Sequence, residues 1–311
     1  MKPTVVSVVG PTAVGKTKLG VEIAKRFNGE VISGDSMQIY RGMDIGTAKV
    51  SQEEANGIPH HMIDIKNPEE SFSVAEFQEK VTAAIEDILS RGKLPIIVGG
   101  TGLYIQSVLY AFNFSEQKRS VETTERLEAE LQEKGKKALH QCLAEIDPEQ
   151  AEKIHPNNER RLIRALEIYE STGMTMSEYQ KNQSEESPYQ PILIGLEMDR
   201  EHLYDRINRR VDLMMEEGLL EEVHTLYEAG LEEAQSMKAI GYKEFIPYLR
   251  GEYDLERAVE LLKRNSRRYA KRQYTYFRNK MDIRWYTISE EDYLEKFQII
   301  LGDLAGMIEQ T

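Results

Sequence analysis

The N-terminal stretch constrains the fold of this chain more than any other part of it. An apolar, β-branched run, Val5–Val9, enters a loop of the form G-x-x-x-x-G-K-[ST], and Leu19 and Ile23 follow at helical spacing. This pattern predicts a strand, a phosphate-binding loop and a helix in immediate succession. The loop consists of Gly10, Pro11, Thr12, Ala13, Val14, Gly15, Lys16 and Thr17.

The residues of this loop suit a di- or triphosphate with Mg²⁺ as cofactor. Glycines let backbone N–H groups turn towards phosphate oxygens, and the start of the helix favours an anion. Lys16 adds a positive charge, and the Thr17 hydroxyl is the expected protein ligand of Mg²⁺. The alternative is a glycine turn in an α/β fold that has no ligand.

Composition places the chain among soluble globular proteins. It has 311 residues, of which 40% are hydrophobic and 30% charged, and no apolar run approaches the roughly 20 residues that span a bilayer. The sequence enters a strand without a signal peptide, so we expect a cytoplasmic monomer with no membrane partner. Cys142, the single cysteine, permits no internal disulfide and is expected to be a small core residue.

The charge distribution points to a polyanionic partner despite a formal net charge of −13. The segment from Arg257 to Arg284 holds ten basic and two acidic residues, so it carries +8 and the remainder of the chain carries −21. Local charge decides where a nucleic acid docks. Within Lys271–Arg278, aromatic residues alternate with cations, as in segments that stack on bases and neutralise phosphates. The alternative is a half-buried helix whose aromatic residues belong to the core.

Further strands predict a parallel α/β sheet with functional residues at one edge. The candidate strands after the first are Glu30–Ser33, His60–Ile65, Ile96–Val98, Pro191–Leu196 and Asp282–Thr287. Asp35 follows the second of them and Thr101 follows a glycine turn after Ile96–Val98, so both are expected at the edge where such sheets bind ligands. Asp35 has the alternative interpretation of a turn or capping residue, and Thr101 that of a helix cap.

A strongly charged helical region interrupts the strand pattern. From Val121 to about Gln180 there is no strand candidate, and the strand pattern returns at Pro191. We therefore predict a P-loop NTPase-like core in 1–115, an inserted all-helical lid in 116–186, and completion of the core by 187–311 with a basic helical portion. A continuous helix is expected over Leu203–Val223. The arginines of the insertion are candidate contacts for a polyanion or, alternatively, part of a solvated helix face: Arg126, Arg160, Arg161 and Arg164.

Several motifs in order resemble the tRNA dimethylallyltransferases, also called tRNA isopentenyltransferases. The resemblance rests on Gly10–Thr17, Asp35–Tyr40, Asp44–Lys49, Ile58–His61, Gly99–Tyr104, His155–Asn158, Gly241–Tyr242 and Lys271–Gln273. It covers nearly the whole chain, and the number and order of the motifs make it specific. The zinc finger that eukaryotic relatives carry at the C-terminus is absent, as in bacterial-type members.

The resemblance implies transfer of a dimethylallyl group from dimethylallyl diphosphate to an adenosine of tRNA. The acceptor would be the exocyclic amine of the adenosine 3′-adjacent to the anticodon, in tRNAs that read codons starting with U. Asp35 matches the family's general base, Thr101 a threonine on the diphosphate, and Arg210 an arginine on the diphosphate. Residues expected to contact the anticodon stem-loop, besides the four arginines above, are Ser36, Met37, Gln38, Lys238, Gly241, Tyr242, Lys271, Arg272, Gln273, Tyr274 and Arg278.

Three other functions remain open at this point. A P-loop kinase for a small hydroxyl compound shares the loop and the acid but has no need of the basic segment. An adenylate isopentenyltransferase uses a free nucleotide as acceptor. A non-catalytic RNA-binding module with a structural P-loop gives Asp35 and Thr101 no reason to face one edge.

Overall fold

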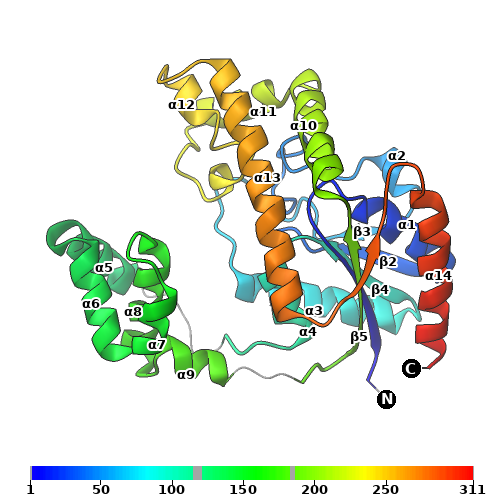
Figure 1. Cartoon of the computed structure of the whole chain (residues 1–311), viewed down its shortest axis with the longest axis horizontal. Helices are drawn as coiled ribbons and strands as arrows, with labels where there is room; N and C mark the ends of the chain where they lie inside the picture. Colours follow the sequence, from blue (N-terminus) through cyan, green and yellow to red (C-terminus); the bar gives the residue numbers. More distant parts are fainter. Residues whose placement is uncertain (1, 115–120, 183–185, 311) are drawn as a thin grey trace. The chain divides into compact units, whose positions relative to one another are not determined.

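The computed structural model describes residues 2–114, 121–182 and 186–310, and it divides into two compact units. Unit 1 combines 1–109 with 187–311, and unit 2 is the segment 110–186 between them (Figure 1). The predicted insertion, 116–186, lies within unit 2. Its predicted start, between 115 and 116, falls outside the described residues.

Unit 1 is built on one six-stranded parallel sheet with the order β3-β2-β4-β1-β5-β6, which confirms the predicted α/β class. The strands are β1 (Thr4–Val9), β2 (Gly29–Ser33), β3 (His60–His61), β4 (Leu94–Gly99), β5 (Gln190–Glu197) and β6 (Arg284–Thr287). The prediction of a strand over His60–Ile65 was too long. Met62 and Asp64 have φ values of 64° and 55°, in the left-handed region, and this ends the strand.

Helices cover both faces of this sheet because its strands are apolar on both sides. Val6 and Val8 of β1 share a buried cluster with α1 (Lys16–Arg26) and α14 (Tyr293–Glu309) on one face. On the other face, α3 (Val74–Ser90) and α4 (Gly102–Leu109) pack on β2 and β4 (Figure 1). The start of β2 is tied to its surroundings by Glu30, which is 2% exposed and accepts hydrogen bonds from Arg91 and Lys93.

The remaining helices of unit 1 follow the strands or lie in the connections. They are α2 (Gln52–Ala55), α10 (Arg200–Glu216), α11 (Leu219–Glu228), the 3-10 turn η1 (Ser236–Lys238), α12 (Ile246–Leu249) and α13 (Leu255–Lys280). The continuous helix predicted over Leu203–Val223 is in fact two helices. Gly218, with φ at 100°, precedes the start of α11 and breaks the helical path.

Every regular element in the described residues of unit 2 is a helix. Its helices are α5 (Val121–Lys134), α6 (Lys136–Ile146), α7 (Pro148–Lys153), α8 (Glu159–Thr172) and α9 (Met176–Lys181). Leucines of α5, α6 and α8 form its own buried cluster. Cys142 is exposed on α6, so its prediction as a core residue was wrong: the buried face of that helix passes through Leu139 and Leu143 instead.

Within the described residues, no helix combines the length and the apolar character that crossing a membrane requires.

Candidate active site

The loop between β1 and α1 has the backbone that its glycines predict. Gly10 has φ at 144°, and a Cβ there would lie 2.5 Å from the carbonyl oxygen of Leu196, so only glycine fits beside β5. Gly15 has φ at 104° and precedes the first residue of α1, Lys16. The Lys16 ammonium donates to the carbonyl oxygen of Pro11 at 2.6 Å, and Arg206 of α10 donates to that of Ala13 at 2.9 Å. Both cations therefore hold the loop closed.

Three charged side chains lie near one another at this edge of the sheet. Enclosure by protein lowers the pKa of Lys16 to about 7, and the charge of Arg210 acts in the same direction. Burial raises the pKa of Asp35, although the N–H of Met37 and the charges of Lys16 and Arg210 oppose that rise. Burial also lowers the pKa of Arg210, which Asp35 partly offsets. Proximity of Asp35, Lys16 and Arg210 is the central feature of the site.

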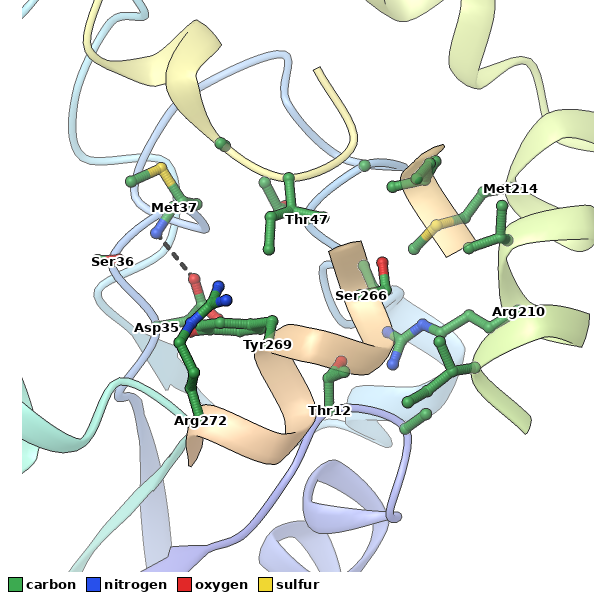
Figure 2. Close-up of a pocket in the computed structure, with 18 of the residues that line it drawn as sticks. Thr12, Asp35, Ser36, Met37, Thr47, Arg210, Met214, Ser266, Tyr269 and Arg272 are labelled. Carbon is green, nitrogen blue, oxygen red and sulfur yellow. Dashed lines mark hydrogen bonds between the residues drawn. The ribbon is translucent and has the colours of Figure 1, made fainter. Parts of the chain in front are cut away.

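Asp35 is held in a defined orientation just after β2. Its Oδ1 accepts the backbone N–H of Met37 at 2.8 Å, which closes a turn of the kind that aspartate favours. Its own N–H donates to the hydroxyl of Ser33 at 3.3 Å. Asp35 is thus a turn residue, which was one of its two interpretations, and its side chain also faces the cavity described below (Figure 2).

Thr101 lies beside the same turn. Its Oγ1 accepts the N–H of Ser36 at 3.3 Å, and its own N–H donates to the carbonyl oxygen of Gly34 at 3.3 Å. Its carbonyl oxygen also accepts the N–H groups of Tyr104 and Ile105 at the start of α4. A Cβ on Gly99 would lie 2.4 Å from the backbone of Gly34, so paired glycines allow the ends of β2 and β4 to meet.

A cavity of about 260 Å³ opens next to Asp35 (Figure 2). Its polar lining residues include Thr12, Asp35, Arg210, Lys238 and Arg272. Its apolar lining residues come from α10, α13 and the turn after η1. They are Ile207, Val211, Met214, Ala239, Ile240 and Leu262. The remaining lining residues are Ala13, Ser36, Met37, Gly46, Thr47, Ala48, Ser266 and Tyr269. The cavity therefore offers charged groups that suit an anion and apolar side chains that suit a hydrocarbon group.

Four of the residues predicted to contact tRNA line this cavity: Ser36, Met37, Lys238 and Arg272. Others have structural partners. Gln273 is 4% exposed, accepts the N–H of Thr12 at 2.8 Å and donates to the carbonyl oxygen of Gly100 at 3.1 Å. Gly241 is buried and Tyr242 is 0% exposed. These three residues link unit 1 internally, and they leave no exposed surface for a nucleic acid.

Gln38 and Tyr274 also have internal partners. Gln38 accepts from the Ser33 hydroxyl and donates to the carbonyl oxygens of Thr47 and Ala48. The hydroxyl of Tyr274 accepts the N–H of Met198 at 3.0 Å. The prediction of an aromatic-basic recognition segment is therefore only partly supported, because half-buried aromatic residues of α13 pack inside unit 1.

The cations of α13 fall into two groups. Lys263 pairs with Asp212, and Arg278 pairs with Glu197 and lies over the Trp285 ring. Arg267, which donates to Asn208, and Lys280, at the end of the helix, have no ion pair in the described part of the chain. The same holds for four others, which lie close together in the middle of the helix. They are Arg264, Arg268, Lys271 and Arg272. We call this set the α13 cation stripe.

In unit 2, the predicted arginines divide in the same way. Arg126 pairs with Glu130 and Glu170, and Arg164 pairs with Glu167 at 2.7 Å. Arg160 and Arg161 are exposed in the first turn of α8, and neither has an ion pair among the residues that the structure describes.

Sequence reasoning missed several residues of the cavity. Tyr269 is the main one: burial raises its pKa to about 12, and the charge of Asp35 acts in the same direction. Its position four residues before Gln273 was an available signal, because that spacing places both on one helix face. Ser266 and Met214 were missed as well.

The side chains at the loop limit how a metal ion could be coordinated there. Among the described residues, no group of three or more His, Cys, Asp or Glu side chains could hold a metal ion. Thr17 is exposed directly after Lys16. A threonine hydroxyl fits Mg²⁺ that takes its other oxygen ligands from a diphosphate and water, and not a cation held by protein alone.

Comparison with known proteins agrees with this geometry. The family model described as IPP transferase matches residues 38–280. A protein of Oceanobacillus iheyensis named tRNA dimethylallyltransferase is 61% identical over 100% of this chain and 99% of its own. A relative of the same name from Bacillus cereus is 58% identical over 97% of this chain and 94% of its own.

Solved structures give the same result. The tRNA isopentenylpyrophosphate transferase of Bacillus halodurans is 53% identical, covers 100% of this chain and 98% of its own, and has a TM-score of 0.77. A eukaryotic dimethylallyltransferase, described as acting on tRNA, is 34% identical, covers 93% of this chain and 75% of its own, and has a TM-score of 0.80. The chain therefore belongs to the tRNA dimethylallyltransferases, a family of prenyl-transferring enzymes.

Proposed function

We propose that this enzyme transfers a dimethylallyl group from dimethylallyl diphosphate to the exocyclic amine of the adenosine 3′-adjacent to the anticodon, in tRNAs that read codons starting with U. The observation that carries this proposal is the proximity of Asp35, Lys16 and Arg210 beside a cavity with apolar lining residues. Opposite charges near one apolar pocket suit a reaction that separates an anionic leaving group from an allylic carbon.

The loop from Gly10 to Thr17 would hold the diphosphate. As the bond between the allylic carbon and the diphosphate oxygen breaks, its electron pair moves to that oxygen, and negative charge accumulates there. Lys16, Arg210 and the loop amides stabilise this charge most strongly in the transition state. Thr17 would hold Mg²⁺, which when bound neutralises part of the diphosphate charge. Thr101, beside the turn of Asp35, would position the diphosphate near the breaking bond.

Asp35 would act as the general base. The adenine nitrogen forms its new bond to the allylic carbon and loses a proton, which the Asp35 carboxylate accepts. A raised pKa suits this role because it brings the carboxyl closer to the operating pH. A stacked base cannot enter such a pocket, so the adenosine would be flipped out of the anticodon loop. The unpaired arginines and lysines described above would bind tRNA phosphates.

The reaction is tested by incubating the protein with labelled dimethylallyl diphosphate, Mg²⁺ and one acceptor at a time. Label in unmodified tRNA supports the proposal. Label only in AMP would identify an adenylate isopentenyltransferase, and phosphoryl transfer from ATP to a small acceptor would identify a kinase. Binding of tRNA without turnover would leave a non-catalytic RNA-binding module.

The role of Asp35 has its own test. We expect Asp35→Ala to lower turnover by roughly 100-fold or more, the usual effect of removing a general base. The variant should still bind tRNA and pyrophosphate, because neither binding event depends on proton transfer. A matched control is Asp212→Ala, which removes an acid of α10 that pairs with Lys263. An Asp35→Ala enzyme with normal turnover would rule out Asp35 as the base.

A further inference from the structure

One wall of the cavity is a loop that has no regular structure of its own. Gly46, Thr47 and Ala48 line the cavity, and Figure 2 shows Thr47 across it from Thr12. This stretch lies between β2 and α2 and belongs to neither. Its conformation therefore depends on contacts from other elements.

Glu222 of α11 makes most of those contacts. Its carboxylate accepts three consecutive backbone N–H groups, those of Asp44 at 2.7 Å, Ile45 at 2.9 Å and Gly46 at 3.0 Å. Successive N–H groups that converge on one anion form a strong, directional arrangement. A side chain about 180 positions along the chain thus determines the path of this loop.

The same carboxylate fixes a second wall of the cavity. The hydroxyl of Tyr242 donates to Glu222 at 2.6 Å, and Tyr242 follows directly on the turn that supplies Ala239 and Ile240. The Tyr242 ring packs against Gly46, where a Cβ would come within 2.5 Å of it. Burial, and then the charge of Glu222, raise the pKa of Tyr242 far above its usual value, so its hydroxyl stays a donor.

From the loop, hydrogen bonds continue to the turn that holds Asp35. Gln38 donates to the carbonyl oxygens of Thr47 and Ala48, at 3.1 Å and 3.2 Å, and accepts from Ser33 at 2.8 Å. Ser33 in turn accepts the N–H of Asp35. A displacement of the loop would thus be transmitted to the carboxyl group that faces the cavity.

We propose that Glu222 is a positioning residue for prenyl transfer, because it holds the loop 44–48 and the turn before Tyr242 around the side of the cavity that receives the acceptor base. This inference rests on the proposed function. Glu222 would act through the loop and would touch neither substrate. Loss of its carboxylate would misplace the acceptor relative to Asp35 and leave the phosphate loop unchanged.

The test compares Glu222→Gln with Glu221→Gln, which changes an exposed acid in the same turn of α11. An amide has one acceptor oxygen, and its NH₂ group would face the N–H donors, so the four-bond arrangement cannot form. For Glu222→Gln we expect kcat/KM for tRNA to fall by about 10- to 100-fold, typical of a misplaced reacting group. KM for tRNA should rise, and KM for dimethylallyl diphosphate should stay unchanged. Partial unfolding would leave both KM values unaltered.

Amide hydrogen exchange of the ligand-free protein supplies a measurement that does not depend on activity. In Glu222→Gln, the amides of residues 44–48 should exchange faster than in the unaltered protein, and those of β1 and β4 should not. Unchanged exchange at 44–48, or faster exchange there with unaltered kinetics for tRNA, would overturn the inference.

Two further outcomes are distinguishable. If Glu222→Gln fails to fold, Tyr242→Phe removes one of the four hydrogen bonds, and it must show the same changes at a smaller size or the inference is wrong. If the unaltered protein transfers no prenyl group, the proposed function fails and the kinetic part of this inference fails with it. The exchange data would then still decide whether Glu222 holds the loop.

Discussion

At the scale of single residues, enclosure shifts the pKa values of two neighbouring side chains in opposite directions. It lowers the pKa of Lys16 and raises that of Asp35, so it favours the neutral form of both. A diphosphate in the loop would favour the charged ammonium of Lys16, and transfer of a proton from an adenine amine would require the carboxylate form of Asp35. The charged forms, which are unfavourable without substrates, are therefore the ones that the reaction would use.

The shifted pKa of Lys16 predicts a pH dependence of ligand binding. Its ammonium is charged below pH 7 and loses its proton above that value, so its contribution to pyrophosphate affinity should decline as the pH rises. The affinity ratio of the unaltered protein to Lys16→Met should start to fall above pH 7, by up to about tenfold per pH unit. Isothermal titration with inorganic pyrophosphate between pH 6 and pH 9 measures this ratio.

Two variants separate the ionisation of Lys16 from the ionisation of the ligand. The affinity of Lys16→Met changes with pH only through the ionisation of pyrophosphate. Division by that affinity therefore removes the contribution of the ligand. Lys16→Arg keeps its charge throughout this range, so its own ratio to Lys16→Met should stay constant. A ratio for the unaltered protein that stays flat up to pH 9 would show that Lys16 remains fully protonated.

At the scale of elements, α13 combines two sets of residues. One set holds the site together: Gln273 joins the phosphate loop to the turn after β4, and the Tyr276 ring lies where a Cβ on Gly102 would be only 2.2 Å away. The other set is the α13 cation stripe, in which Arg268 and Lys271 are exposed and Arg272 lines the cavity. Under the proposed function, a single helix would place tRNA-binding charges at a fixed position relative to the phosphate loop.

The stripe predicts which basic residues of α13 bind phosphates. Lys271→Gln and Arg272→Gln should each weaken tRNA binding and reduce the slope of log K against log salt by about one. Lys263→Gln is the matched control on the same helix, and it should leave the slope nearly unchanged because Lys263 pairs with Asp212 at 2.5 Å. Filter binding across a salt series gives the slopes. Equal slopes for all three variants and the unaltered enzyme would refute the assignment.

At the scale of the whole molecule, a chain with a net charge of −13 binds a polyanion by local concentration of charge. Unpaired cations occur in both compact units, on α13 of unit 1 and on α8 of unit 2. The acidic remainder of the surface disfavours other orientations of the nucleic acid. Under the proposed function, both sets of cations would contact tRNA phosphates.

This division predicts that a change in unit 2 affects one substrate only. The double variant Arg160→Gln with Arg161→Gln should lower tRNA affinity and reduce the salt slope by about two. Its affinity for pyrophosphate should equal that of the unaltered protein, because the phosphate loop belongs to unit 1. When Lys271→Gln is added to this double variant, the losses of tRNA binding free energy should add, since the contacts are independent. A change in pyrophosphate affinity would contradict this picture.

Features that depend on local chemistry could be predicted from the residues alone. Apolar and β-branched runs predicted the strands, and the glycine spacing at Gly10 and Gly15 predicted a loop whose N–H groups turn inward. The acid and the hydroxyl that follow β2 and β4 were predicted at one edge, because parallel strands end on the same side of a sheet. Such features need only neighbouring residues or the topology of the sheet.

The roles of side chains whose partners lie far along the chain could not be predicted from the residues alone. Lys271 and Gln273 are two positions apart, yet Lys271 is exposed and Gln273 is buried against Thr12. Nothing local shows that Glu222 accepts the N–H groups of residues 44–46, or that Lys263 is paired and Lys271 is not. The physical reason is that burial and hydrogen bonding are set by which elements pack together, and packing of α10, α11 and α13 on the sheet edge joins segments more than 150 residues apart.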